Sequence, residues 1–145
     1  MAVTFGWTAS TGKDRHLISH YRLSKRQMSK KILICDDDEG ILEMLEMALY
    51  AEEHEISTEI NSLKLIGRIR DERPDLLILD LWMPVLSGDQ ITRTLKEMPE
   101  YKNLPILVIS ASRDGEDIAR KAGANDYLAK PFDIDELLKK VESLN

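Results

Sequence analysis

The chain has 145 residues, which is enough for one domain with a substantial core and too few for two domains of ordinary size. Apolar residues make up 43% and charged residues 32%, as is typical of soluble globular proteins, and the single cysteine excludes an intrachain disulfide. No apolar run approaches the ~20 residues that span a bilayer, and the N-terminus lacks the apolar stretch of a secretion signal. We therefore expect a cytoplasmic protein without membrane contact.

Charge is distributed unevenly along the chain. Residues 1–30 hold six Lys or Arg and one Asp, whereas residues 31–145 hold 14 basic and 25 acidic side chains. So acidic a body repels a phosphate backbone, which argues against direct nucleic-acid binding by the folded part. Residues 1–27 show no sustained periodicity and are predicted to be an N-terminal extension, disordered or non-native, with Met28 as an alternative start and the folded domain at residues 28–145.

The first half of this domain begins with a compact apolar run at residues 32–35, predicted as a buried strand. Apolar residues at helical spacing predict a helix over 39–52, with Asp38 as its N-cap. Weak alternation over 55–60 indicates an edge strand. A second helix is predicted from Leu63 to the Arg73-Pro74 pair, and a third apolar run, 76–79, ends at Asp80.

The second half repeats the same pattern. Pro84 and Gly88 mark a turn, and a helix follows that ends near Pro99. Residues 106–109 form another buried strand, 114–122 a short polar helix, 127–129 a brief strand, and 134–141 a final helix capped by Asp133. Five strands alternating with five helices predict an α/β fold with a parallel sheet covered by helices on both faces.

Polar side chains follow four of these strands. They are Asp36 and Asp37, Asp80, Ser110 and Lys130. In an open parallel sheet the carboxyl ends of the strands form the ligand-binding edge, so we expect these groups to meet there. Three carboxylates so close together require a compensating cation, and Mg²⁺ suits an oxygen-rich site that also receives phosphate. One carboxylate could then act as a nucleophile on phosphorus.

Four segments of the chain match motifs of a known protein family. They are ILICDDDEG, LLILDLWMPVLSG, ILVISAS and NDYLAKPF. In this order and spacing, the chain from Lys31 onward resembles the receiver domain of two-component response regulators, as in the chemotaxis regulator of flagellar direction. The resemblance implies a flavodoxin-like, doubly wound sheet of order 2-1-3-4-5. It also implies a phosphorylation switch that autocatalyses its own phosphorylation and dephosphorylation, and is not an enzyme acting on other substrates. Because no sequence follows the last helix, a stand-alone receiver is expected.

The resemblance assigns roles to individual residues. Asp80 resembles the phosphoacceptor, and Asp36, Asp37, Asp80 and the backbone carbonyl of Trp82 would hold Mg²⁺, with Asp36 acting through water. Lys130 would neutralise a phosphoryl oxygen.

Three further residues match the family's switch region. Ser110 would hydrogen-bond the arriving phosphoryl group, Tyr127 would turn inward as Ser110 moves, and Pro131 matches a position that often follows a cis peptide bond. The implied partners are a histidine kinase or histidine phosphotransfer protein and a downstream protein target on the face formed by 114–122, 127–129 and 134–141. A phosphorylation-linked dimer stays open.

Three alternatives compete with this interpretation. A degenerate receiver would bind proteins without being phosphorylated, although all five site residues are present. A phosphatase of the haloacid-dehalogenase type needs an Asp where this chain has Trp82. A flavin mononucleotide site needs a hydroxyl-rich loop where this chain has three carboxylates, Asp36 to Asp38.

Several residues have plainer interpretations. Cys35 is predicted to be a buried strand residue, and Tyr127 could be an ordinary half-buried aromatic. His16, His20 and His54 lack metal-ligand spacing and are expected to be solvated.

Overall fold

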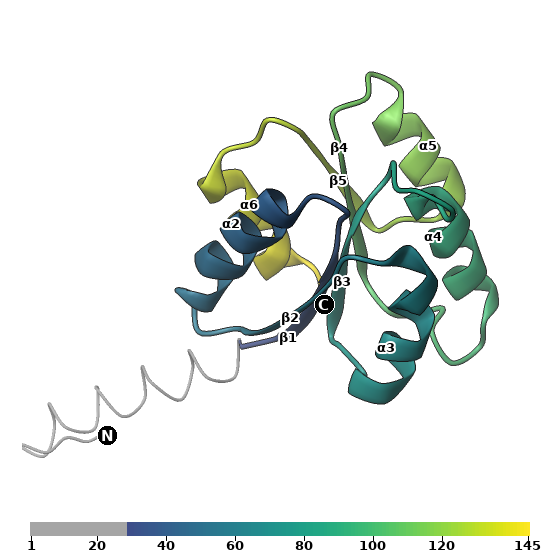
Figure 1. Ribbon diagram of the computed structural model, residues 1–145, viewed down its shortest axis with the longest axis horizontal. Helices are drawn as coiled ribbons and strands as arrows, with labels where there is room; N and C mark the ends of the chain where they lie inside the picture. Colours follow the sequence, from purple (N-terminus) through teal and green to yellow (C-terminus); the bar gives the residue numbers. More distant parts are fainter. Residues whose placement is uncertain (1–28) are drawn as a thin grey trace, which may run out of the picture.

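The computed structural model describes residues 29–145 as alternating strands and helices (Figure 1). The extension predicted for residues 1–27 lies outside this range. The elements are β1 (Lys31–Cys35), α2 (Glu39–Tyr50), β2 (Glu55–Glu59), the 3₁₀ turn η1 (Ser62–Lys64), α3 (Leu65–Glu72), β3 (Leu76–Asp80), α4 (Gly88–Glu97), β4 (Ile106–Ser110), α5 (Gly115–Ala122), β5 (Asp126–Ala129) and α6 (Ile134–Ser143).

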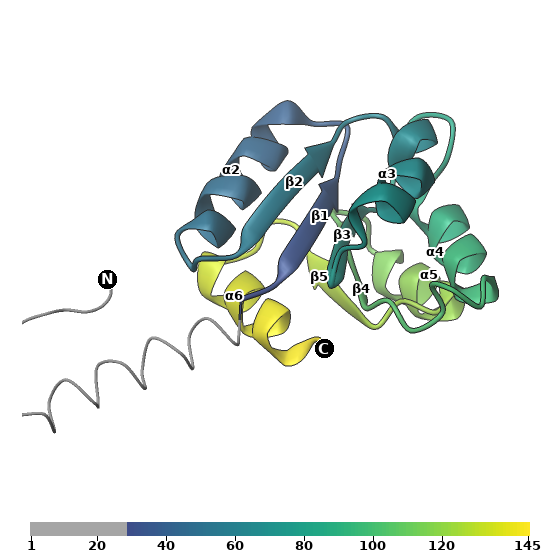
Figure 2. The same cartoon turned by 90° about the horizontal axis from the view of Figure 1, so that it is seen from below.

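All five strands are parallel and lie in the order β2-β1-β3-β4-β5. This confirms the flavodoxin-like, doubly wound order that the family resemblance implied. Figures 1 and 2 show α2 and α6 on one face of the sheet and α3, α4 and α5 on the other. The order reverses direction between β1 and β3, and that is the place where open sheets of this kind bind ligands.

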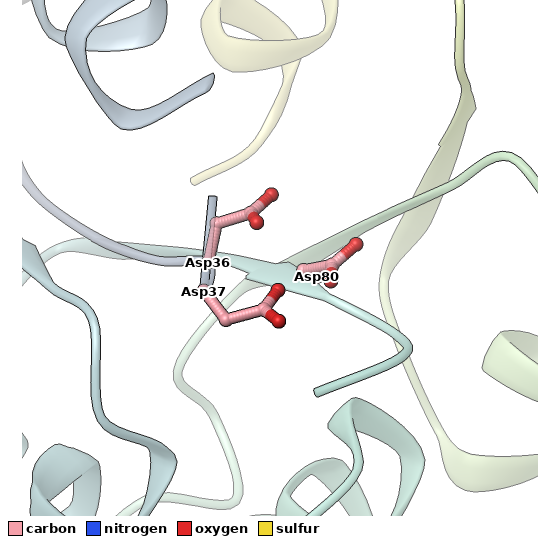
Figure 3. A group of neighbouring side chains, drawn as sticks. All are labelled: Asp36, Asp37 and Asp80. Carbon is pink, nitrogen blue, oxygen red and sulfur yellow. The ribbon is translucent and has the colours of Figure 1, made fainter. Parts of the chain in front are cut away.

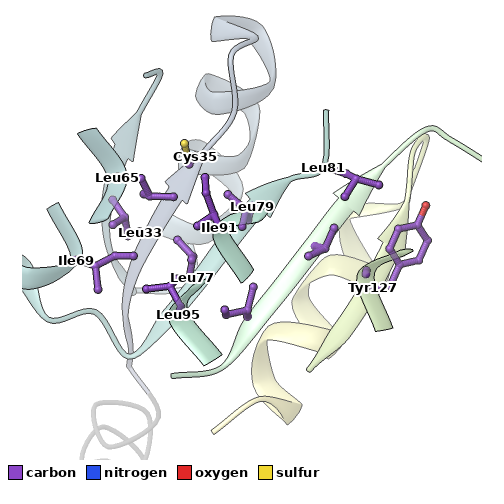
Figure 4. Packing of buried hydrophobic residues seen from close by; sticks show 13 residues of the cluster. Leu33, Cys35, Leu65, Ile69, Leu77, Leu79, Leu81, Ile91, Leu95 and Tyr127 are labelled. Atoms are coloured by element: carbon purple, nitrogen blue, oxygen red, sulfur yellow. The ribbon is translucent and has the colours of Figure 1, made fainter. Parts of the chain in front are cut away.

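The sheet is apolar on both faces because each face packs against helices. In β1, Leu33 and Cys35 join the cluster beneath α3, α4 and α5 (Figure 4), whereas Ile32 and Ile34 join the cluster beneath α2 and α6. Strands β3 and β4 are buried along their whole length. Cys35 is fully buried, as predicted, and burial raises the pKa of its thiol to about 12.

Helix boundaries follow local chemistry. The Asp38 side chain accepts hydrogen bonds from the backbone N–H groups of Gly40 and Ile41, which confirms it as the N-cap of α2. Asp133 occupies the N-cap of α6, although its side chain makes no capping hydrogen bond. The prediction that α2 extends to Glu52 was wrong: the helix ends at Tyr50, and the chain turns through Glu53 with a φ of 67°.

Two further expectations are corrected. The second helix was predicted to begin at Leu63, but α3 begins at Leu65, and Leu63 lies in η1, where Asn61 caps a 3₁₀ turn and Leu63 is 60% exposed. His54 was expected to be solvated, but it is buried, and its Nδ1 accepts a hydrogen bond of 3.0 Å from the Lys30 N–H. His16 and His20 lie outside the described residues. Within residues 29–145, no helix has the length and apolar character needed to cross a bilayer.

Candidate functional site

Three carboxylates project from the adjacent ends of β1 and β3 (Figure 3). Asp36 and Asp37 directly follow β1, and Asp80 is the last residue of β3. One oxygen from each lies within 4.8 Å of the others. Asp36 and Asp80 are buried, whereas Asp37 is exposed and closes the group on the solvent side. The structure thus brings together the acidic residues that the sequence placed at one edge of the sheet.

Lys130 lies between the two buried carboxylates. Its Nζ is 3.0 Å from an oxygen of Asp80 and 3.1 Å from an oxygen of Asp36. The residue follows β5, and the peptide bond to Pro131 is cis, as the resemblance implied. Asp80 and Asp36 precede Lys130 by 50 and 94 residues, and in the fold they share its ammonium group. Sequence alone predicted that Lys130 would face this edge but not that it would join both acids.

The electrostatics of this group follow from its burial. Burial, and after it the neighbouring charge of Asp36, raise the pKa of Asp80 to about 6, although the hydrogen bond and the charge of Lys130 oppose the rise. Burial also raises the pKa of Asp36. Burial alone disfavours the Lys130 ammonium, but its hydrogen bond to Asp80 and the charges of both acids raise its pKa overall. The positive charge of Lys130 therefore does not balance the negative charge of the three acids.

The donor set suits a hard divalent cation. When all three acids are ionised, one ammonium neutralises only part of their charge, and the remaining charge matches a divalent ion. Carboxylate oxygens are the ligands that Mg²⁺ prefers, and the exposed Asp37 leaves room for the waters it retains. Asp36, Asp37 and Asp80 thus fit the predicted metal. The Trp82 carbonyl stays a predicted ligand, and the Trp82 side chain is 53% exposed.

Ser110 and Tyr127 lie next to one another on β4 and β5. The Tyr127 hydroxyl donates to the Ser110 carbonyl oxygen at 3.0 Å, and the ring is only 8% exposed. The Ser110 Oγ accepts a hydrogen bond from the Ser112 N–H at 3.1 Å. Tyr127 is therefore more deeply buried than an ordinary half-buried aromatic. Tyr127 is thus already turned inward and in contact with Ser110, whereas the resemblance implied that it turns inward as Ser110 moves.

Gly88 lies in close contact with the end of β3, which the sequence did not reveal. It was interpreted only as a turn residue, but a Cβ at this position would collide with the carbonyl oxygen of Asp80 and the Cα of Leu81. The first turn of α4 therefore packs directly on the end of β3. No local signal distinguishes a glycine required by such a contact from one required by a turn, because the contact depends on the tertiary arrangement.

A family model described as "Response regulator receiver domain" matches residues 32–142. This span includes β2 to β5, all of β1 except Lys31, and the three clustered acids. The chain belongs to the response regulator receiver family. It is therefore a receiver domain of two-component signalling, and the acidic cluster lies at the edge of the sheet where the family's motifs were recognised.

Curated relatives of this receiver domain include longer regulators. The chain is 36% identical over 118 residues to "Transcriptional regulatory protein PrrA" of Mycobacterium leprae, covering 80% of this chain and 50% of that protein. It is 34% identical over 119 residues to "Phosphate regulon transcriptional regulatory protein PhoB" of Rhizobium meliloti, covering 81% of this chain and 52% of that protein. The receiver domain thus spans about half the length of these relatives.

Solved structures show the same fold. A putative response regulator from Chloroflexus aurantiacus superposes with a TM-score of 0.77 at 33% identity, covering 80% of this chain and 97% of that chain. The chemotaxis protein CheY4 of Vibrio cholerae superposes with a TM-score of 0.74 at 27% identity, covering 81% of this chain and 99% of that chain. Both comparisons agree with the sheet order described above.

Proposed function

We propose that Asp80 of this receiver domain accepts a phosphoryl group with the help of Mg²⁺. The observation that carries the proposal is the Lys130 ammonium within 3.1 Å of both Asp36 and Asp80, with Asp37 beside them. Lys130 would neutralise a phosphoryl oxygen, and Asp36, Asp37 and the Trp82 carbonyl would hold the metal together with Asp80. Mg²⁺ would supply charge neutralisation at the phosphoryl oxygens.

The transfer is an in-line displacement. A carboxylate oxygen of Asp80 forms a bond to phosphorus while the bond between phosphorus and the donor's imidazole nitrogen breaks, and the electron pair leaves with the imidazole. The donor would be a phosphohistidine of a histidine kinase or a histidine phosphotransfer protein. The protein contributes mainly position and electrostatics, since the buried carboxylate already faces the site. Attack by water on the acyl phosphate would reset the switch.

Phosphorylation would be transmitted through Ser110 and Tyr127. The Ser110 hydroxyl would move to bond a phosphoryl oxygen, and Tyr127 would follow because its hydroxyl already bonds the Ser110 carbonyl. The affected face consists of α5, β5 and α6, which we propose as the site for a downstream protein target or a second phosphorylated copy. We place this activity in the cytoplasm and in residues 28–145, without direct nucleic-acid contact by the domain.

The test is intact-mass spectrometry after incubation with acetyl phosphate and Mg²⁺. Wild type should gain one phosphoryl group, whereas Asp80→Asn, or wild type in chelator, should gain none. Asp38→Asn is the matched control, because Asp38 neighbours the site in sequence but caps α2, and Asn caps helices equally well. A wild type that stays unmodified, or an Asp80→Asn variant that is still modified, would overturn the proposal; the first outcome would favour a degenerate receiver.

A further inference from the structure

Gly115 lies against both members of the Ser110–Tyr127 pair. It is the first residue of α5 and is buried. A Cβ at this position would lie 2.6 Å from the Tyr127 hydroxyl oxygen, 3.1 Å from the Ser110 Cβ and 3.2 Å from the Ser110 Oγ. The distance to the hydroxyl is far below van der Waals contact, so no side chain at residue 115 is compatible with the observed position of Tyr127.

The Tyr127 hydroxyl is fixed in this space by hydrogen bonds. It lies 3.0 Å from the Ser110 carbonyl oxygen and 3.4 Å from that of Ser112. The ring projects from β5, where Tyr127 is in register with Val108 of the neighbouring strand, toward the end of β4 (Figure 4 shows its buried position). The hydroxyl therefore occupies the place that a side chain of residue 115 would otherwise fill.

The obstacle to a larger residue is steric and does not come from the backbone. Gly115 has no positive φ, unlike Gly123, whose φ is 101°. Alanine would therefore be acceptable to the backbone and is the better helix former. Ser110 belongs to a fully buried strand of the sheet, whereas Tyr127 can rotate about its side-chain bonds. The collision would thus be relieved by outward rotation of Tyr127.

We propose that Gly115 is a positioning residue: its lack of a side chain provides the space in which the Tyr127 hydroxyl holds the Ser110 carbonyl and so sets the orientation of Ser110 at the site. Its effect on transfer rests on the proposed function of Asp80. None of the three atoms nearest to a Cβ at Gly115 belongs to the clustered acids.

The first experiment reads the position of Tyr127 without phosphorylation. Protein labelled with 3-fluorotyrosine is studied by fluorine NMR, with the Tyr127 resonance assigned from Tyr127→Phe. Gly115→Ala should shift this resonance and increase its solvent exposure. Gly67→Ala is the matched control, because a Cβ at Gly67 in α3 meets nothing within 4 Å. An unchanged Tyr127 resonance in Gly115→Ala would overturn the proposal, whether or not the wild type is phosphorylated.

The second experiment measures the rate of phosphorylation by acetyl phosphate at saturating Mg²⁺. Gly115→Ala should slow it about five-fold, the factor expected for loss of one hydrogen bond. In a Tyr127→Phe background the hydroxyl is absent and only the contacts of 3.1 Å and 3.2 Å with Ser110 remain, so Gly115→Ala should have a smaller further effect. The Mg²⁺ dissociation constant from calorimetry should not change, because the acids are untouched.

Two results of this rate experiment would overturn the proposal. Equal slowing by Gly115→Ala in both backgrounds would show that the effect does not act through Tyr127, and a weakened Mg²⁺ affinity would show general damage to the site. Failure of the wild type to be phosphorylated would refute the proposed function instead, and the fluorine signal would then decide the steric claim alone.

Discussion

Asp80 is held in a place that favours its neutral form, because it is buried beside Asp36. Its pKa, raised from 3.8 to about 6, corresponds to a destabilisation of at most about 3 kcal/mol when the group is ionised. We predict that Asp80→Asn increases the free energy of unfolding of chelator-treated protein at pH 7 by about 1–2 kcal/mol, since loss of the Lys130 contact offsets part of the gain. Urea denaturation measures the difference.

The sign of the pH dependence follows from the direction of the shift. A carboxyl whose pKa is raised on folding destabilises the protein above the folded pKa of about 6, where it is ionised. Below the unfolded pKa the group is protonated in both states, and the penalty is gone. The advantage of Asp80→Asn should therefore disappear as the pH falls from 6 to about 4. Asp38→Asn is the control, and a gain that persists at low pH would contradict this explanation.

Trp82 is large, 53% exposed and two residues beyond Asp80. A bulky side chain at the mouth of the site should hinder the water that attacks the acyl phosphate. We predict that Trp82→Asn changes the dephosphorylation rate several-fold, measured by the decay of phosphorylated protein after the donor is removed. Tyr50→Asn, at an exposed aromatic on α2, provides the control. A rate identical to that of the wild type would rule out shielding by Trp82.

Among the elements, a glycine inside α3 and a glycine at the end of α5 have opposite effects on stability. Gly67 lies within α3, and a Cβ added there would meet nothing within 4 Å, so the glycine only weakens the helix. Gly123 ends α5 with a φ of 101°, in the left-handed region that alanine enters at a cost. These two positions form a matched pair, because the same substitution acts on helices of equal length.

We predict that Gly67→Ala raises the free energy of unfolding by about 0.5–1 kcal/mol through helix propensity. Gly123→Ala should lower it by about 1 kcal/mol, because the backbone is strained and the new Cβ lies 3.2 Å from the Lys96 side chain. Thermal denaturation of both variants under one set of conditions tests the pair. If both substitutions changed the free energy of unfolding in the same direction, the left-handed backbone at Gly123 would not explain why this glycine differs from Gly67.

Element bounds show which local signals were reliable. The buried strands were predicted closely, because central parallel strands are short apolar runs bounded by polar residues. The helix ends were less accurate, as at Tyr50, where no Gly, Pro or Asn follows closely to mark the end of the helix. Leu63 was misplaced because a 3₁₀ turn interrupts the helical period, and a single apolar residue cannot reveal which period it follows.

For the whole molecule, metal binding should couple to stability, since the acid cluster exists only when β1 and β3 are paired. We predict that adding Mg²⁺ to chelator-treated protein raises its melting temperature, with a stabilisation of about 2.7 kcal/mol at a hundred-fold excess over the dissociation constant. Asp37→Asn should abolish the effect without unfolding the protein, because Asp37 is exposed. An equal stabilisation of wild type and Asp37→Asn by Mg²⁺ would exclude this site.

The sequence by itself determined the order of elements, the parallel sheet and the edge at which Asp36, Asp37, Asp80, Ser110 and Lys130 gather. It could do so because apolar periodicity is local and because the carboxyl ends of parallel strands necessarily share one edge. Only the tertiary structure decided which atoms touch there.

The Lys130 bridge, the burial of His54 and the close packing of Gly88 and Gly115 are contacts of this second kind. Each joins residues from separate elements, so its distance depends on how helices and strands pack in three dimensions. Burial then sets the electrostatics, because a carboxyl has no raised pKa until the folded chain removes it from water.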